Sequence, residues 1–412
     1  MTEELQSVSN ISPQLIGLAA LMRKVFAGEN LKPLAAELSA RAERDHDDAN
    51  ALLDLSTILQ MNFQHTLAMQ VQMEALKTQR IFHIPAAKQP AKLRLLLMMG
   101  AGDLLSNSPL ECLVENSDID LDMVYVASFL PLPEIVPDHD VLFVAVGESD
   151  ENISLLRELA DIQQVWPRPV LNAPGRIALL ERDSTCAMLG DVPGVVMPLA
   201  VRVSRQTLAE IDAQQQPLSR VLENADYPVI IRPVDSHAGR GLAKLERAAE
   251  LHKYLLAMSE NDFYIAPFID YRSADGQFRK YRIVMIDGRP YICHLAISSH
   301  WMIHYLNAGM AESAEKRAEE DRCFASFDTG FALKHAQALQ TIYRRMGLDY
   351  LGIDCAETPA GELLIFEVDS NMIVHAFDPV ETYPYKQPQM QKVFAAFRAL
   401  LFKTAGKDAG AQ

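Results

Sequence analysis

Apolar residues recur every three or four positions through the first part of the chain, which is the spacing of one face of an α-helix. The spacing is clear between Leu15 and Phe26 and again between Met69 and Leu76. Gly28 and Pro33 interrupt it, as residues that end or begin helices do. We therefore expect helices up to about residue 84, forming an N-terminal helical domain over residues 1–90.

Prolines and alanines gather at residues 85–90, which we interpret as a linker. After this segment the spacing of the apolar residues changes. Three apolar runs without polar alternation follow, and a helical segment lies after the third. The expected strands are residues 92–99, 121–126 and 141–146, with a helix at 151–164. Uninterrupted apolar strands joined by crossovers indicate a parallel sheet covered on both faces. Gly100 and Gly102 lack the third glycine of a dinucleotide-binding turn, so they indicate a nucleotide site only weakly. We assign an α/β domain to residues 91–193.

Short strands and helices alternate after residue 193, which predicts a further α+β domain over residues 194–405, ahead of a disordered tail at 406–412. The expected strands are residues 195–202, 228–233, 242–245, 263–268, 280–286 and 290–298. The expected helices are residues 206–212, 248–258, 311–322, 329–346 and 393–402. Asp328 is the expected N-cap of the helix at 329–346, and Gly347 lies just past its end. The chain as a whole is expected to be α/β with an all-α region at its start.

Residues 351–375 form the most informative stretch, since their pattern predicts two strands joined by a Pro-Ala-Gly turn. Glu367 and Asp369 are two positions apart and therefore share one face of the second strand. A hairpin would bring Asp354 beside them. Three carboxylates on one face repel one another, and a hard cation such as Mg²⁺, held together with substrate phosphates, would compensate them. The alternative is an edge hairpin whose acidic face is simply solvated.

Composition narrows the classes of partner. The chain has 412 residues, with 38 Lys and Arg against 54 Asp and Glu, for a net charge of −16. This field disfavours nucleic acid and anionic membrane as main partners. Five scattered cysteines without a CxxC pair fit a reducing compartment. A polar, acidic N-terminus and the absence of a long apolar run lead us to expect a cytoplasmic protein.

Two basic elements precede the acidic hairpin. The first is the glycine-bearing loop at residues 235–241, which follows a strand carrying Arg232. Glycines let backbone N–H groups converge on an anion, although such a loop is more often only a turn. The second is a strand with Arg279, Lys280 and Arg282, which can bind phosphates or can form a solvated face.

The order of these elements resembles the ATP-grasp superfamily of carboxylate–amine and carboxylate–thiol ligases. The resemblance covers roughly residues 194–375 and rests on the segments PVIIRP, HAGRGL, FYIAPFID, FRKYRIVMIDGRPY, GIDCAE and LLIFEVDSN. It implies two lobes, at about residues 194–263 and 264–405, preceded by the α/β domain. The helices at residues 48–80 loosely resemble a tetratricopeptide-type hairpin, which would serve either to dock a partner or to cap the next domain.

The resemblance also implies roles for individual residues. Arg232 would contact ATP phosphates in place of the usual lysine, and Arg282, with Arg279, would contact the γ-phosphate or an acyl phosphate. The flap over the phosphates would comprise Ser236, His237, Gly239, Arg240 and Gly241. The hinge against adenine would comprise Pro267, Phe268 and Ile269, with Asp270 or Asp275 holding the ribose. Arg182 would replace a second family lysine.

The same resemblance assigns the metal and the substrates. Asp354, Glu367 and Asp369 would bind Mg²⁺, with Asn371 as the alternative third ligand. The substrate pocket would be formed by His300, Trp301, His304 and His375, although His300 and His304 could instead belong to a buried aromatic corner or, with His294, to a metal site.

The expected function is an ATP- and Mg²⁺-dependent ligase that activates a carboxylate as an acyl phosphate and couples it to an amine. The substrates would be small molecules, or the acceptor would be a peptide, and a homodimer is possible. The alternatives are a degenerate nucleotide-binding scaffold with a docking module and a small-molecule kinase on the same fold.

Overall fold

The computed structural model describes residues 13–223, 225–236, 239–304 and 307–410. The chain divides into two compact units, Met1–Ala145 and Val146–Gln412, which we call unit 1 and unit 2. The helical region and the first sheet therefore belong to one compact unit. The finer division into domains at residues 90 and 193 stays a prediction. Within the described residues, no helix is both long and apolar enough to cross a membrane.

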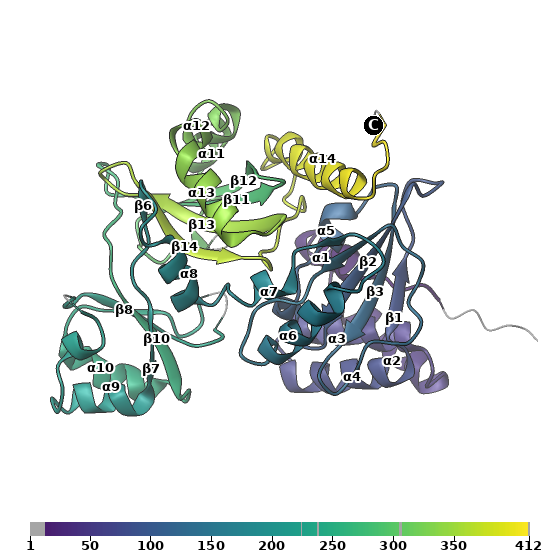
Figure 1. Ribbon diagram of the computed structural model, residues 1–412, viewed down its shortest axis with the longest axis horizontal. Helices are drawn as coiled ribbons and strands as arrows, with labels where there is room; N and C mark the ends of the chain where they lie inside the picture. Colours follow the sequence, from purple (N-terminus) through teal and green to yellow (C-terminus); the bar gives the residue numbers. More distant parts are fainter. Residues whose placement is uncertain (1–12, 224, 237–238, 305–306, 411–412) are drawn as a thin grey trace, which may run out of the picture. The chain divides into compact units, whose positions relative to one another are not determined.

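Unit 1 begins with four helices, as the apolar spacing predicts (Figure 1). They are α1 (Leu18–Phe26), α2 (Lys32–Arg44), α3 (Ala49–Met61) and α4 (His65–Thr78). Leu21, Leu38 and Ile58 are buried together between α1, α2 and α3. The prediction of helix up to residue 84 is wrong at its end, because Ile81–Ile84 forms strand β1. Its four residues pair with a neighbouring strand, and that pairing overrides the local helical pattern.

The sheet of unit 1 has the strand order β1-β3-β2-β4. Its remaining strands are β2 (Leu93–Gly100), β3 (Ile119–Val126) and β4 (Val141–Val144), and its short helices are η1 (Leu104–Ser106) and α5 (Glu111–Val114). Both β3 and β4 run parallel to β2, as predicted, whereas β1 is antiparallel to β3. All of the residues of β4 are buried, which explains why its sequence shows no polar alternation.

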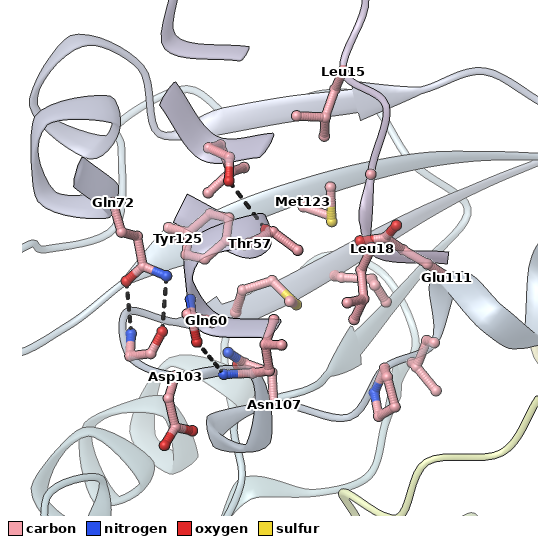
Figure 2. Close-up of a pocket in the computed structure, with 18 of the residues that line it drawn as sticks. Leu15, Leu18, Thr57, Gln60, Gln72, Asp103, Asn107, Glu111, Met123 and Tyr125 are labelled. Atoms are coloured by element: carbon pink, nitrogen blue, oxygen red, sulfur yellow. Dashed lines mark hydrogen bonds between the residues drawn. The ribbon is translucent and has the colours of Figure 1, made fainter. Parts of the chain in front are cut away.

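The loop after β2 is held by two glutamine side chains from the helices (Figure 2). The Gln72 amide donates to the Gly102 carbonyl at 2.8 Å and accepts from the Gly102 N–H at 2.9 Å. Gln60 Oε1 accepts from the Leu104 N–H at 2.7 Å. Because these side chains already bind the backbone N–H groups of Gly102 and Leu104, those donors are not presented to a phosphate.

Two buried carboxylates meet the start of α1 in the same part of unit 1. Asp54 accepts from the N–H groups of Ile16 and Gly17 at 2.8 and 3.0 Å, and Glu111 accepts from the Ala19 N–H at 3.2 Å. The first N–H groups of a helix have no partner within the helix, so these carboxylates satisfy them from outside.

Unit 2 opens with several short elements and also contains a four-stranded and a five-stranded sheet. The short elements are α6 (Ile153–Gln163), β5 (Val170–Leu171), α7 (Pro174–Ile177), α8 (Arg182–Leu189) and β6 (Val195–Val196). The predicted helix at 151–164 corresponds to α6. The predicted strand at 195–202 is instead two strands, β6 and β7 (Val201–Ser204), which join different sheets. Pro198 lies between them and has no backbone N–H to donate to a ladder, which accounts for the break.

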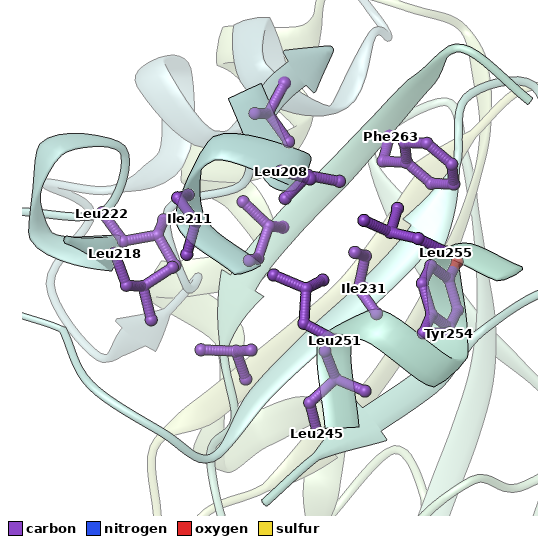
Figure 3. Close-up of a cluster of buried hydrophobic side chains, with 13 residues drawn as sticks. Leu208, Ile211, Leu218, Leu222, Ile231, Leu245, Leu251, Tyr254, Leu255 and Phe263 are labelled. Carbon is purple, nitrogen blue, oxygen red and sulfur yellow. The ribbon is translucent and has the colours of Figure 1, made fainter. Parts of the chain in front are cut away.

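A four-stranded antiparallel sheet with the order β7-β10-β8-β9 forms the first of these sheets. Its other strands are β8 (Val229–Pro233), β9 (Ala243–Leu245) and β10 (Asp262–Pro267), and its helices are α9 (Arg205–Asp212), η2 (Leu218–Arg220), η3 (Ala248–Glu250) and α10 (Leu251–Ala257). Leu208 from α9, Leu251 from α10 and Phe263 from β10 are buried in one hydrophobic cluster (Figure 3). This cluster fixes α9 and α10 on one face of the sheet.

A five-stranded sheet with the order β12-β11-β13-β14-β6 forms the second. Its further strands are β11 (Phe278–Ile286), β12 (Arg289–Ser298), β13 (Tyr350–Glu357) and β14 (Leu363–Asp369), and its helices are α11 (Ala314–Ser326), α12 (Phe331–Lys334), α13 (Ala336–Met346) and α14 (Lys386–Thr404). Both α11 and α14 pack against β12. The mixed α/β fold class predicted from the sequence is confirmed.

The predicted helix at 329–346 is divided in the structure. Gly330, not Asp328, precedes α12, and His335 lies between α12 and α13 with φ −100° and ψ 14°. The His335 ring is buried and its Nε2 lies 2.8 Å from Glu357 Oε1. Side-chain contact with β13 thus coincides with the break. Gly347 ends α13 in the left-handed conformation, as predicted.

Candidate functional site

The acidic hairpin is formed by β13 and β14 with its turn where the sequence places it. The Gly361 N–H donates to the Thr358 carbonyl at 2.8 Å, and Gly361 has a positive φ that suits glycine. The register sets Asp354 directly opposite Glu367 and sets Gly352 opposite Asp369. The three acids therefore start from the same face of the sheet, as the alternation predicts.

A partly open cavity lies beside the end of β14 in unit 2. Several residues predicted to bind ATP or metal line it, and they come from different elements of unit 2. They are Arg182, Arg232, Ser236, Glu367, Asp369 and Asn371. The cavity thus brings together the arginine predicted to contact phosphates, the start of the predicted flap and most of the predicted metal ligands.

Two arginines give one side of the cavity its positive charge. Arg232 lies on β8 and its Nε donates to Ser236 Oγ at 3.1 Å, while Ser236 Oγ donates to the Pro233 carbonyl at 2.7 Å. Arg182, at the start of α8, forms an ion pair with Glu367 and donates to the Phe366 carbonyl at 3.0 Å. Burial, assisted by the nearby charge of Arg182, lowers the pKa of Arg232 to about 10. An anion placed between the two guanidinium groups would relieve their mutual repulsion.

Asp354 is held differently from the other acids. It is 3 % exposed, and its Oδ1 accepts from Arg282 Nε at 2.8 Å. Its Oδ2 accepts from Arg282 Nη2 at 2.9 Å and from Lys280 at 2.8 Å. Burial opposes ionisation, but Arg282 and Lys280 outweigh it and hold the pKa of Asp354 below its usual range. Both oxygens of the Asp354 carboxylate are thus engaged by these two cations. Asp354 is not among the residues that line the cavity.

The donor set of the cavity fits Mg²⁺. Glu367, Asp369 and Asn371 offer hard oxygen atoms, and Mg²⁺ in phosphate-transferring proteins is commonly held by one or two carboxylates together with substrate phosphates. Among the described residues, no three His, Cys, Asp or Glu side chains are gathered as a self-sufficient metal site.

Of the rest of the predicted flap, the described residues Gly239, Arg240 and Gly241 are not among those that line the cavity. His237 lies outside the described residues. Arg240 is exposed and pairs with Glu260 at 2.6 Å. Gly241 has φ +67° and a β-carbon there would lie 2.7 Å from Pro233 Cδ, so only glycine suits this position. Gly239 also has a positive φ, of 75°.

The predicted adenine hinge follows the end of β10. Pro267 pairs with Val229, and the Phe268 N–H donates to the Pro228 carbonyl at 3.1 Å. The ammonium of Lys244 lies 3.8 Å from the centre of the Phe268 ring, a cation–π contact. Ile269 is half-buried just beyond. Asp270 is exposed and pairs with Arg272, which lowers the pKa of Asp270.

The remaining predicted residues lie apart from the described cavity lining. Arg279 binds the carboxylates of Glu319 and Asp275, so its guanidinium is already engaged. His300 is exposed, and Trp301 packs edge-to-face on Phe268 with ring centroids 5.8 Å apart.

Two further histidines were assigned to the substrate pocket. Burial lowers the pKa of His304, and the neighbouring cation of Lys280 lowers it further. The His375 ring stacks on Phe377 at 4.9 Å. The assignment of all four aromatic and histidine residues to a substrate pocket stays a prediction.

Among the lining residues that sequence reasoning missed are the polar side chains of Glu148, Thr185, Asp235 and Tyr264. Burial and then the charge of Asp235 raise the pKa of Glu148 to about 8. The Tyr264 hydroxyl donates to Glu181 at 2.9 Å. Glu148 follows Gly147, just beyond the carboxyl end of strand β4, and ligand-binding residues often lie beyond such ends. This position after a strand is the one signal in the sequence, and a single acid there carries little information by itself.

No family model matches the chain. Solved structures that are similar to it include the VanG D-Ala:D-Ser ligase from Enterococcus faecalis, at 16% identity and a TM-score of 0.45, covering 76% of this chain and 99% of that one. D-alanine–D-alanine ligase from Bacillus anthracis is similar as a complex with ATP, at 12% identity and a TM-score of 0.44, over 76% and 96% of the two chains. A second structure of that ligase has 10% identity and a TM-score of 0.45, over 76% and 97%.

Proposed function

We propose that the protein is an ATP-dependent ligase that activates a carboxylate as an acyl phosphate and joins it to an amine. The observation that carries the proposal is the composition of the cavity in unit 2. Arg182 and Arg232 provide positive charge in the cavity wall. Glu367, Asp369 and Asn371, which line the same cavity, provide oxygen atoms that can bind a metal ion. Cations for phosphate oxygens beside hard ligands for a phosphate-bound metal are what phosphoryl transfer requires.

In the first step a substrate carboxylate oxygen attacks the γ-phosphorus of ATP. A P–O bond forms to the carboxylate, the bond from the γ-phosphorus to the bridging oxygen breaks, and ADP leaves with the electron pair. Arg232 and Arg182 would neutralise charge on the transferring group, which remains dispersed over its oxygens. Ser236 holds the Arg232 side chain at 3.1 Å and so restricts its orientation.

In the second step an amine attacks the acyl carbon. A C–N bond forms, the C–O bond to phosphate breaks, and inorganic phosphate leaves with the electron pair while the nitrogen loses its protons to phosphate and solvent. The contribution of the protein is placement and charge neutralisation. Neither step forms a covalent bond between the substrate and the protein.

Mg²⁺, when bound, would neutralise phosphate oxygens and orient them. We assign Glu367, Asp369 and Asn371 to hold it. Glu367 forms an ion pair with Arg182. Glu367 would therefore bind the metal ion while Arg182, beside it, would contact the phosphate. Asp354 would act through Arg282 and Lys280, since both of its oxygens bind them.

The direct test is to measure release of ADP and phosphate over pools of carboxylates and amines. We expect release that depends on both pools and a product mass equal to that of an amide. Glu367→Gln should lose most of this activity, whereas Glu362→Gln, an exposed acid on the same hairpin, should retain it. Equal release by parent and Glu367→Gln would refute the proposal, and a phosphate ester as the product would indicate a kinase.

A second candidate is a protein that binds nucleotide without turnover. The observation that favours it is that Glu367 and Asp354 are both already paired with protein cations. Calorimetry with ATP would then show binding, while no combination of carboxylate and amine would release ADP. Absence of ATP binding would exclude both candidates.

A further inference from the structure

Asn371 packs directly against the backbone of Gly147. A β-carbon placed on Gly147 would lie 1.5 Å from Asn371 Nδ2 and 2.5 Å from its Cγ, far inside any possible contact distance. Both residues are buried, and Asn371 is only 6 % exposed. The amide of Asn371 therefore occupies the space in which any other residue at position 147 would place its side chain.

Both partners in this contact are held by hydrogen bonds. The side-chain Oδ1 of Asn371 accepts from Ser370 Oγ at 3.0 Å, and the backbone N–H of Asn371 donates to Asp369 Oδ1 at 2.9 Å. On the other side, the Gly147 carbonyl accepts from Asn152 Nδ2 at 3.0 Å, and Asn152 is 8 % exposed at the start of α6. A side chain at position 147 would have to displace one of these two hydrogen-bonded groups.

We propose that Gly147 is a positioning residue for the loop at residues 369–371. Gly147 positions this loop by leaving room for the Asn371 amide, so that Asp369 and Asn371 keep their places in the cavity wall. The inference rests on the proposed function, because these two residues are the ones assigned to the phosphate-bound metal. The turn that holds them comes from the segment beyond β4, and the next residue of that turn, Glu148, lines the same cavity.

A double-mutant cycle on thermal stability tests the contact without any ligand. Gly147→Ala should lower the melting temperature by at least ~3 °C in the parent. It should have little effect in an Asn371→Ala background, where the clashing amide is gone. Gly175→Ala is the matched control, because a β-carbon there would meet nothing closer than Ala160 Cβ at 3.8 Å. An equal loss of stability in both backgrounds would overturn the inference.

The second readout is ATP binding by calorimetry, with Mg²⁺ and again with the metal chelated. Gly147→Ala should weaken binding at least ~10-fold with Mg²⁺ and much less without it, since the displaced loop carries the metal ligands. Gly175→Ala should match the parent in both conditions. Parent-like binding by Gly147→Ala would overturn the functional role of the contact. A parent that binds no ATP would instead refute the proposed function, while the stability cycle would still decide whether Gly147 positions Asn371.

Discussion

Asp354 and Arg282 form a two-point hydrogen-bonded pair, with Arg282 Nε 2.8 Å from Asp354 Oδ1 and Nη2 2.9 Å from Oδ2. The residues face each other across β13 and β11. Asp354 is buried and Arg282 is half-buried, so solvent shields the charges of the pair less than it would at the surface. Removing one member leaves the other charged and without its partner, which is far more costly than losing an exposed ion pair.

We therefore predict that Asp354→Asn lowers the free energy of unfolding by about 3–5 kcal/mol. Asp328→Asn is the control, because Asp328 pairs with Arg289 at 3.7 Å on the surface and its loss should cost less than about 1 kcal/mol. Denaturant unfolding of the three proteins measures both values. Similar losses for the two variants would contradict the interpretation of Asp354 as a structural anchor for Arg282 and Lys280.

Arg182 provides a second prediction, about nucleotide binding. Hydrogen bonds to charged groups contribute about 1.5–3 kcal/mol, which corresponds to about 10- to 150-fold in affinity. We expect Arg182→Ala to weaken ATP binding within that range, as measured by calorimetry. Arg344→Ala, an exposed arginine whose Nε binds its own helix, should bind ATP as the parent does. Unchanged binding by Arg182→Ala would remove Arg182 from the phosphate site.

The hairpin was predictable because two local signals agree. The alternation along β14 sets Glu367 and Asp369 on one face, and Pro359-Ala360-Gly361 specifies the turn. The engagement of Asp354 was not predictable. It depends on the register between β11 and β13, which places Arg282 opposite Asp354 across residues far apart in the sequence. No local pattern reports such pairing.

Other errors have the same origin. Ile81–Ile84 has a sequence compatible with the end of a helix, but pairing with β3 makes it a strand. His335 fits the helical pattern around it. In the structure its ring contacts the Glu357 carboxylate, and the helix is divided at this residue. The role of Glu148 was missed for a different reason, because a single acid after a strand carries little information until the cavity it lines is known.

The hydrophobic cluster under the four-stranded sheet gives a third prediction, on stability. Leu251 and Leu256 lie on the same helix, α10, but Leu251 is 1 % exposed and Leu256 is 76 % exposed. Leu251→Ala should lower the free energy of unfolding by about 2–5 kcal/mol, because it leaves a cavity in a packed cluster. Leu256→Ala should change it by less than about 0.5 kcal/mol. Equal effects of the two substitutions in urea unfolding would show that burial of Leu251 in the cluster does not stabilise the four-stranded sheet and its helices.

The carboxylates at the start of α1 predict a pH dependence for unit 1. Burial raises the pKa of Asp54 to about 6 and that of Glu111 to about 7 in the folded protein, although both accept backbone hydrogen bonds that oppose the shift. Carboxyl groups with raised folded pKa values bind protons more tightly when folded, so they stabilise the fold most below their unfolded pKa values. That stabilisation is lost as pH rises from about 4 to about 7. Hydrogen exchange of the α1 amides should therefore become faster, beyond the intrinsic rate increase, across this range.

Glu111→Gln separates this effect from the titration of the rest of the chain. Glutamine keeps an oxygen that can accept from the Ala19 N–H, but it does not ionise. We expect the variant to keep α1 protected and to flatten the upper part of the pH dependence, between about 5 and 7, while leaving the part due to Asp54. Glu74→Gln is the control, since Glu74 is an exposed acid on α4 that pairs with Lys77 of the same helix. An unchanged pH profile in Glu111→Gln would mean that the Glu111 carboxyl does not govern how firmly α1 is held.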